Sequence, residues 1–256
     1  MNPLAADLRR RANAAALAEP LGITLDPWQR QILETSRATL VLAARQGGKS
    51  LASSLAAVHV ALYEAGATVL CVSPGIRQSG LLFQKCIAAY RGLGRPVISE
   101  SETALQLQLE NGSRIVALPG SNEATLRGYT ARLVVIDEAA RVPDSTMAAL
   151  RPSLAVSGGR ILAISTPSGR RGWLFDAWES EEDWERIRVP AWEIPRIPES
   201  WLESEKLALG PLFDQEYGCQ FVQSELQYFS AETVAKIWKK PDPKRPAKPA
   251  EEDPDA

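Results

Sequence analysis

Hydrophobic residues fall into two patterns that alternate along this chain. Short uninterrupted apolar runs are typical of strands buried on both faces, and longer segments with apolar positions three or four apart are typical of helices. The runs predict buried strands at 39–43, 67–74, 133–136 and 160–166. The longer segments predict helices at 1–20, 27–33, 51–64, 77–91, 173–180 and 198–209. This alternation predicts an α/β fold with a mostly parallel sheet and helices on both faces.

Two further segments have strand character but a different pattern. Residues 105–109 alternate apolar and polar side chains, Asn111-Gly112 supplies a turn, and 114–118 returns as a second strand. This pattern predicts a hairpin with one face in solvent. Residues 184–192 are also expected to form a strand.

The composition adds few constraints. The chain has 256 residues, 45% hydrophobic and 23% charged, which is ordinary for a soluble protein with one large core or a core and a small appendage. The three cysteines are scattered, so neither a disulfide framework nor a zinc site is indicated. Without an 18-residue apolar run or a signal-peptide core, no membrane association is expected, and the predicted compartment is the cytoplasm. The formal net charge of −2 gives no bulk attraction to nucleic acid, so any DNA contact requires a local patch.

The first candidate site is the turn between the strand at 39–43 and the helix that follows. Its sequence approximates G-x-x-x-x-G-K-[ST], a loop whose backbone N–H groups surround a phosphate chain, although Ala43 stands where the first glycine is usual. Lys49 is expected on the β- and γ-phosphates and Ser50 on Mg²⁺. A strand–helix corner with a surface lysine is the alternative. The expected nucleotide-binding residues of this loop are Ala44, Gln46, Gly47, Gly48, Lys49 and Ser50.

The second candidate site is a pair of acids at the end of the strand at 133–136. Asp137 and Glu138 follow four apolar residues, and ligands bind at the carboxyl ends of strands in open α/β sheets. Asp137 is expected to belong to the Mg²⁺ shell, and Glu138 to orient and deprotonate the attacking water. A strand ending in exposed acids is the alternative.

Two weaker signals complete the candidate site. Gln29 lies a short way before the loop and could pair with the N6/N7 edge of adenine, although a surface glutamine is the ordinary interpretation. Ser165 and Thr166 end the strand at 160–166, which is expected beside the phosphate-binding strand, where small hydroxyls could sense a γ-phosphate.

Together these pieces resemble the ATPase domain of phage terminase large subunits, the DNA-packaging motors of tailed phages. The resemblance extends over residues 25–222, in the order of the family. The matching segments are 27–29, 44–50, 73–74 with 77–79, 111–113, 127–129, 135–139, 165–167 and 216–221.

The resemblance implies further roles and partners. Arg45 would reach the γ-phosphate, and Arg127 would act on the nucleotide of a neighbouring subunit, with a structural salt bridge as its alternative. Ser165 and Thr166 would couple hydrolysis of Mg²⁺-bound ATP to movement of a lid. The implied partners are double-stranded DNA, further copies in a homo-oligomeric ring, a portal protein and a small terminase subunit. The implied location is the cytoplasm of a bacterial host.

The chain differs from the family in one respect, its length after Phe221. The family continues into a nuclease domain, but only about 35 residues follow Phe221, fewer than the roughly 100 of a typical domain. No nuclease activity is expected from this chain. Either a nuclease resides on a separate polypeptide or the gene is truncated. The expected parts are a helical segment at 1–24, a P-loop ATPase core at 25–170, a lid at 171–238 and a disordered Pro-rich tail at 239–256.

Two other functions stay open. One is a split or remnant subunit that binds nucleotide or partners without turnover. The other is a helicase-like translocase, which would need a second domain of the same kind.

Overall fold

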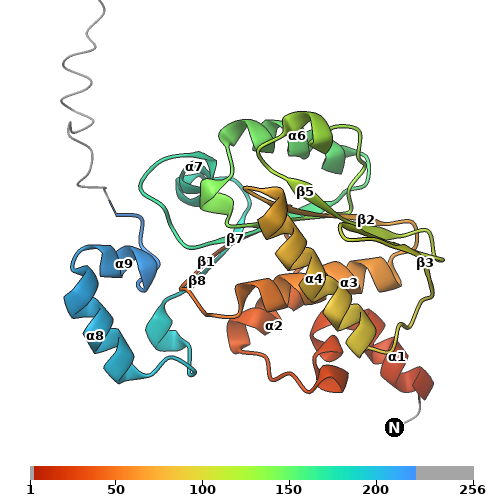
Figure 1. The fold of residues 1–256 in the computed structure, drawn as a ribbon, viewed down its shortest axis with the longest axis horizontal. Helices are drawn as coiled ribbons and strands as arrows, with labels where there is room; N and C mark the ends of the chain where they lie inside the picture. Colours follow the sequence, from red (N-terminus) through yellow and green to blue (C-terminus); the bar gives the residue numbers. More distant parts are fainter. Residues whose placement is uncertain (1–2, 223–256) are drawn as a thin grey trace, which may run out of the picture. The chain divides into compact units, whose positions relative to one another are not determined.

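An eight-stranded sheet forms the centre of the computed structural model, which describes residues 3–222 (Figure 1). The strand order is β3-β4-β5-β2-β6-β7-β1-β8. All neighbours from β5 to β8 are parallel, and β3 and β4 are antiparallel to their neighbours. The strands are β1 (Thr39–Ala43), β2 (Thr68–Ser73), β3 (Ser99–Glu102), β4 (Gln106–Leu109), β5 (Arg114–Pro119), β6 (Leu133–Asp137), β7 (Arg160–Ser165) and β8 (Glu185–Val189).

Helices cover both faces of this sheet. Figure 1 shows α2 and α3 on one face and α6 and α7 on the other. The helices are α1 (Pro3–Ala12), α2 (Pro27–Glu34), α3 (Lys49–Tyr63), α4 (Ile76–Gly92), α5 (Glu123–Leu126), α6 (Asp144–Ala155), α7 (Trp173–Glu179), α8 (Glu199–Leu209) and α9 (Leu212–Glu216). The predicted α/β fold is confirmed.

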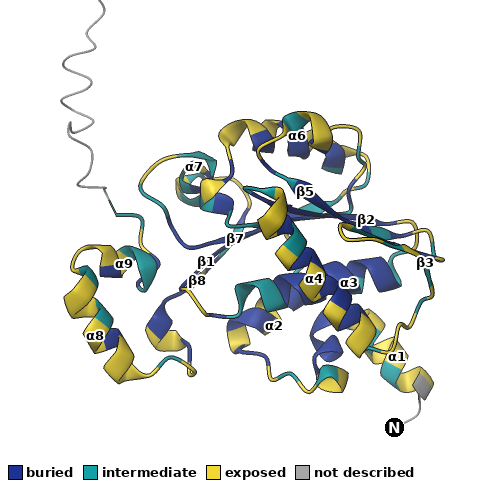
Figure 2. Ribbon diagram, in the orientation of Figure 1, coloured by how far each residue is buried: buried dark blue, intermediate teal, exposed yellow. Residues whose placement is uncertain are grey.

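The burial of the strands explains the two strand patterns in the sequence. Every residue of β1 and β2 is buried, because helices pack on both faces of the central strands (Figure 2). In β4, by contrast, half-buried and buried residues alternate. It pairs antiparallel with β5, so the predicted hairpin at 105–118 is confirmed. No helix within residues 3–222 combines the length and apolarity needed to cross a bilayer.

The N-terminal segment differs from the single helix predicted at 1–20. Helix α1 ends at Ala12, and a separate 3-10 turn, Ala14–Leu17, follows. The Asn13 side chain accepts a hydrogen bond from Ala15 N, 2.8 Å away. Asparagine side chains compete in this way with helical backbone bonds, which ends one helix and begins the next turn.

The segment at 171–222 also differs from the predicted division of the chain. Strand β8 lies within the expected lid range, yet it pairs in parallel with β1 as the edge strand of the main sheet. It ends at Val189, because Pro190 has no N–H to continue the ladder, so the strand is shorter than the predicted 184–192. Residues 3–222 all belong to one compact unit. The predicted tail at 239–256 lies outside the described residues.

Candidate nucleotide site

The turn from β1 to α3 has the backbone geometry of a phosphate-binding loop. Gly48 has φ +87°, in the left-handed region, and a Cβ there would lie 2.6 Å from Gln29 Nε2. Glycine is therefore required at this position. Lys49 and Ser50 begin α3, and the first N–H groups of a helix have no acceptor within it, so they are free for an anion. Ala43, which replaces the usual first glycine, is the buried last residue of β1.

The Lys49 ammonium lies inside this loop. Its Nζ donates hydrogen bonds to the carbonyls of Ala43, at 2.7 Å, and Ala44, at 2.8 Å. Burial lowers the pKa of Lys49, and the nearby carboxylates of Glu138 and Asp137 act in the opposite direction. A half-buried cation at an anion-binding turn is suited to phosphate, which can take the place of the two carbonyls.

Asp137 and Glu138 lie at the carboxyl end of β6, facing the loop. Ser50 Oγ lies 3.4 Å from Asp137 Oδ2, so the two predicted metal-binding groups meet. Burial raises the pKa of Asp137, as does the negative charge of Glu138. Glu138 has φ +53°, an uncommon conformation for a residue other than glycine, and its N–H donates to Asp137 Oδ1 at 3.1 Å. The chain thus turns sharply here, with both acids next to Lys49 and Ser50.

This pair of oxygens fits a magnesium ion. Mg²⁺ usually takes one or two protein oxygens and fills its shell with water and substrate phosphates. A hydroxyl and a half-buried carboxylate 3.4 Å apart, next to a phosphate-binding turn, are such a donor set. Within residues 3–222, no group of three or more His, Cys, Asp or Glu side chains is placed to hold a metal ion.

Ser165 and Thr166 lie between the phosphate-binding loop after β1 and the acid pair at the end of β6. Strand β7 pairs with β6 on one side and β1 on the other, so the predicted proximity of 160–166 to the phosphate-binding strand is confirmed. Ser165 Oγ accepts a hydrogen bond from Ala140 N at 3.1 Å and donates one to Thr166 O at 2.7 Å. The hydroxyl therefore joins the end of β7 to the segment directly after Glu138.

Gln29 lies beside the loop, with its amide group hydrogen-bonded within the protein. Its Oε1 accepts a hydrogen bond from Asp26 N at 2.9 Å, and its Nε2 lies 3.3 Å from Gly48 O. The residue is 2% exposed, so both amide atoms serve to join the start of α2 to the loop. This arrangement differs from the adenine contact expected from the sequence, which would require both bonds to break.

A neighbouring contact was missed by sequence reasoning. Arg196 donates to both carboxylate oxygens of Asp26, at 2.8 and 2.7 Å, and to Gly47 O at 3.1 Å. These hydrogen bonds and the charge of the guanidinium lower the pKa of Asp26. Arg196 follows an irregular stretch with no periodic pattern, and no sequence signal connects it to the loop.

The two predicted catalytic arginines lie in different surroundings. Arg45, in the loop, forms an ion pair with Glu216 of α9, and the hydrogen bond to that carboxylate raises the Arg45 pKa. Arg127 follows α5, and its 71% exposed side chain lies 3.6 Å from Glu123. The structure therefore brings Arg45 to the site and leaves Arg127 on the surface, a position compatible with both of its alternatives.

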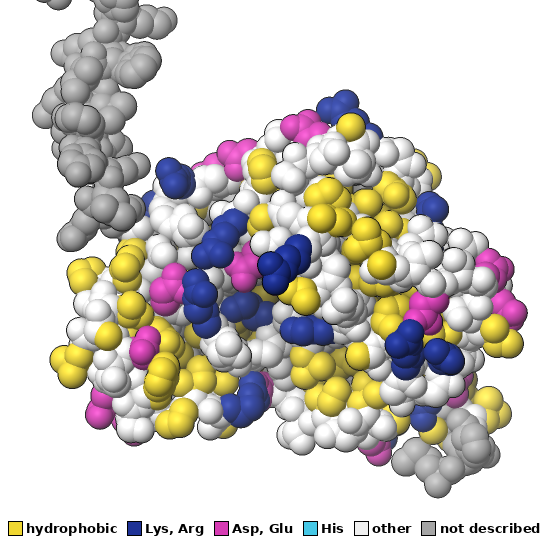
Figure 3. All heavy atoms as spheres, in the orientation of Figure 1, with side chains coloured by type: hydrophobic (Ala, Val, Ile, Leu, Met, Phe, Trp, Pro, Cys, Tyr) yellow, Lys and Arg dark blue, Asp and Glu magenta, His cyan; other side chains and the backbone are white. Residues whose placement is uncertain are grey.

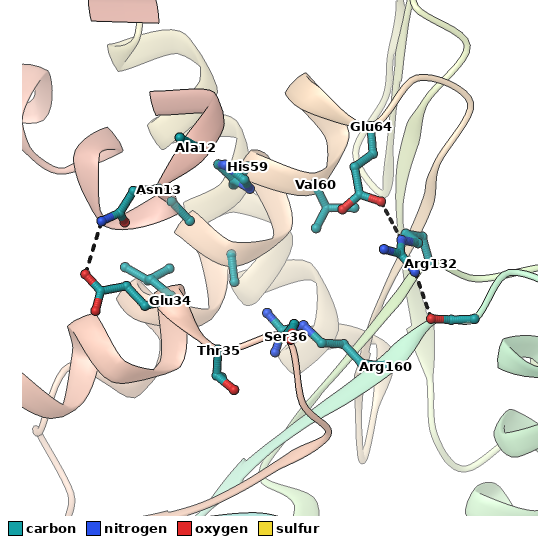
Figure 4. A pocket seen from close by; sticks show the side chains of 14 residues that line it. Ala12, Asn13, Glu34, Thr35, Ser36, His59, Val60, Glu64, Arg132 and Arg160 are labelled. Carbon is teal, nitrogen blue, oxygen red and sulfur yellow. Dashed lines mark hydrogen bonds and ion pairs between the residues drawn. The ribbon is translucent and has the colours of Figure 1, made fainter. Parts of the chain in front are cut away.

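A cavity lies away from these residues. Its volume is about 640 Å³, and its lining includes His59 of α3 and Arg132 and Arg160 at the starting ends of β6 and β7 (Figure 4). None of the predicted site residues lines it. Basic side chains are concentrated in another place. On the face shown in Figure 3, Lys and Arg side chains gather in the middle, between the α8–α9 segment and the sheet.

Comparison with known proteins agrees with this geometry. The family model described as "Terminase large subunit, T4likevirus-type, N-terminal" matches residues 40–236. The terminase large subunits of Thermus phage G20c and Thermus virus P23-45 are each 27% identical to this chain, over 77% of it and 48% of their own length. The chain thus spans about half the length of these curated relatives.

Solved structures show the same fold. The large terminase ATPase domain of Thermus phage P74-26 has a TM-score of 0.72 at 24% identity, covering 80% of this chain and 96% of that one. The HK97 large terminase has a TM-score of 0.67 at 16% identity, covering 82% and 55%. A third structure is the large terminase of a thermophilic bacteriophage in complex with ADP. It has a TM-score of 0.61 at 12% identity, covering 80% of this chain and 52% of that one. The fold is thus that of a P-loop NTPase, and because the family model matches most of the chain, this chain belongs to the terminase large subunit family, in its N-terminal region.

Proposed function

We propose that this chain binds ATP with Mg²⁺ and hydrolyses it, as the ATPase of a motor that moves double-stranded DNA into a capsid. The observation that carries the proposal is the meeting of Lys49, Ser50 and Asp137 with Glu138 at one edge of the sheet. A phosphate-binding turn, a metal-binding oxygen pair and a nearby carboxylate are the parts that hydrolysis of a triphosphate requires. That carboxylate belongs to Glu138, whose Oε2 lies 3.8 Å from Arg141 Nη1.

Each residue has a distinct task in this reaction. Lys49 and the N–H groups at the start of α3 bind the β- and γ-phosphates, and Ser50 and Asp137 would hold Mg²⁺. The metal, when bound, neutralises charge that develops on the phosphates. Glu138 orients the attacking water and accepts its proton. The Arg45 guanidinium stabilises charge on the γ-phosphate once it leaves Glu216.

Coupling and assembly are the finer parts of the proposal. Ser165 and Thr166 would couple ATP hydrolysis to movement of a lid, because Ser165 Oγ is hydrogen-bonded to the segment that follows Glu138. We further propose a homo-oligomeric ring on a portal protein, served by a small subunit, in line with membership of the terminase large subunit family. Arg127, whose side chain is exposed after α5, would reach the nucleotide of a neighbouring subunit. The large terminase of the thermophilic bacteriophage is known with ADP and with ATP-gamma-S, which supports adenine nucleotides as the ligands here.

Phosphate release by the purified chain, with and without linear duplex DNA, tests the proposal. We expect Lys49→Ala to lose nucleotide binding and turnover. Glu138→Gln should bind ATP but hydrolyse it about 10²–10⁴-fold more slowly, the usual contribution of a general base. Glu203→Gln on the exposed surface of α8 is the control for loss of a carboxylate. Hydrolysis at the wild-type rate by Glu138→Gln would contradict the assignment of the base, and ATP binding without hydrolysis by the wild type would favour the remnant subunit.

A further inference from the structure

Resting on the proposed function, we propose that Ser73, at the carboxyl end of β2, is a positioning residue for the magnesium site: its hydroxyl donates a hydrogen bond to the carboxylate of Asp137 when the metal is bound. Ser73 is completely buried, and among the described residues no group hydrogen-bonds to its Oγ. The side chain therefore carries a hydrogen-bond donor that the fold itself does not use.

An unpaired hydroxyl at this place is unfavourable for the fold. Folding removes the group from water and gives it no hydrogen bond in return. Ser73 is the last of six buried residues in β2, and an alanine would fill the position without that cost. Buried polar groups in native proteins are nearly always paired, so an exception calls for an explanation. A partner that is in place only when a ligand is bound is such an explanation.

The backbone of Ser73 is firmly placed, so the unpaired hydroxyl is not the result of a loose strand end. Its carbonyl accepts a hydrogen bond from Gly120 N at 2.7 Å, and its Cα pairs with Pro119 of β5. On the other side, Val72 pairs with Ile136 of β6. Because neighbours on both sides fix the backbone, rotation about the Cα–Cβ bond is the movement that can bring the hydroxyl to a partner.

The register of β2 and β6 identifies that partner. Val72 pairs with Ile136, and one residue further along both strands Ser73 lies beside Asp137. Side chains at paired positions of parallel strands point to the same face, and neighbouring strands lie about 4.8 Å apart. Ser50 of α3 lies 3.4 Å from Asp137 on this face. The unpaired hydroxyl and the carboxylate are therefore neighbours on the face that carries the predicted metal site.

The Asp137 carboxylate has room for another donor. An ionised carboxylate can accept about four hydrogen bonds. Here Oδ1 accepts one from Glu138 N at 3.1 Å, and Ser50 Oγ lies 3.4 Å from Oδ2, beyond the usual range of about 2.5–3.0 Å for two oxygens. Carboxylates that bind a metal are themselves hydrogen-bonded by neighbouring groups, which fix their orientation. Ser73 is placed to supply such a bond from the β2 side.

Titration calorimetry of the full chain with ADP, over a range of Mg²⁺ concentrations and in EDTA, tests this role. Ser73→Ala removes the hydroxyl and little volume. We expect it to raise the Mg²⁺ concentration at which half of the tightening of ADP is reached about 10- to 100-fold, the usual effect of removing a group that orients a metal ligand. The affinity for ADP in EDTA should be unchanged. In an Asp137→Ala background, Ser73→Ala should have no further effect, because the carboxylate on which it acts is gone.

Thermal denaturation of the chain without nucleotide or metal gives a second measurement. Removing an unpaired buried donor relieves its desolvation, so we expect the Tm of Ser73→Ala to equal or exceed that of the wild type. The matched control is Ser113→Ala. Ser113 is equally buried, directly before β5 at the starting ends of the parallel strands, and its hydroxyl donates to Ala61 O. This control should lower the Tm and leave the Mg²⁺ dependence unchanged.

Each other outcome overturns the proposal. A lower Tm for Ser73→Ala would show that the hydroxyl already has a partner without the metal. An unchanged Mg²⁺ dependence, or an equal loss of ADP affinity in Mg²⁺ and in EDTA, would show that the hydroxyl does not act on the metal site. The same conclusion follows if the wild type binds ADP equally with and without Mg²⁺.

The outcomes also separate this proposal from the proposed function. If the wild type binds no ADP, the proposed function fails and the role of Ser73 fails with it. If the wild type binds ADP in a Mg²⁺-dependent way but hydrolyses no ATP, only the proposed function fails. If it hydrolyses ATP and Ser73→Ala has the wild-type Mg²⁺ dependence, only the role of Ser73 fails.

Discussion

Replacing Arg196 with methionine removes the guanidinium that joins Asp26 to the phosphate-binding loop. The variant keeps much of the apolar stem but leaves a carboxylate that is 9% exposed without its partner, and Gly47 O without a donor. Exposed ion pairs contribute about 0.2–1 kcal/mol, and breaking a fully buried pair costs about 3–5 kcal/mol. Because the Arg196 side chain is 50% exposed, we expect a loss of about 1–2 kcal/mol at neutral pH.

Thermal denaturation at several pH values measures this loss. For a domain of this size, about 1–2 kcal/mol corresponds to a decrease in Tm of roughly 2–8 °C. Arg196 lowers the pKa of Asp26 below its ordinary 3.8. A carboxyl group with a lowered pKa in the folded state stabilises the fold above its unfolded pKa, and this contribution is lost as the pH falls through the folded pKa. The difference in Tm between wild type and variant should therefore be constant from about pH 5 to pH 8 and narrow only below about pH 3.8.

The control is Arg151→Met, which breaks an exposed pair. Arg151 lies 2.8 Å from Glu182, and the two side chains are about equally exposed. We expect a loss below about 1 kcal/mol. If Arg196→Met is no more destabilising than Arg151→Met at neutral pH, the reasoning from the buried Asp26 carboxylate is refuted.

Two further substitutions test the backbone and the core, each followed by urea denaturation. Gly48→Ala forces a Cβ into a left-handed position 2.6 Å from Gln29 Nε2, so we expect a loss of at least about 1–2 kcal/mol; an unchanged midpoint would show that the turn can relax. Tyr90→Phe removes a buried hydroxyl that donates to Val97 O at 2.6 Å, and leaving that carbonyl without its donor should cost about 1–3 kcal/mol. A change below about 0.5 kcal/mol in Tyr90→Phe would indicate that water replaces the hydroxyl.

Much of the fold could be predicted because the signals are local. Uninterrupted apolar runs predict the central strands, which are buried on both faces, and the alternation at 105–109 predicts β4, which is buried on one face. In each strand the residue pattern alone indicates how many faces are buried. The same holds for the turn before Lys49 and for the two acids at the end of β6, where a short stretch of backbone positions all the atoms concerned.

The contacts that could not be predicted join residues far apart in the chain. Arg196 and Asp26 are 170 positions apart, and both lie outside the apolar parts of the helices and strands. Their pairing depends on how the segment after β8 returns to the loop, which no local pattern records. The contacts of Gln29 could not be predicted for a related reason: they join its amide to Asp26 and to Gly48, and the second of these is 19 positions away.

The order of the strands has a consequence for self-association. A sheet that does not close exposes a row of unpaired backbone groups along each outermost strand, where another chain can add by strand pairing and begin aggregation. The outermost strand β3 has the sequence Ser-Glu-Ser-Glu, and charged side chains discourage such pairing. At the opposite end, the segment after α9 lies against β8: Cys219 Sγ donates to Val189 O at 3.2 Å, and Gly218 O accepts a hydrogen bond from the Arg188 side chain. The two ends of the sheet are therefore protected by different means, charge at one and a covering segment at the other.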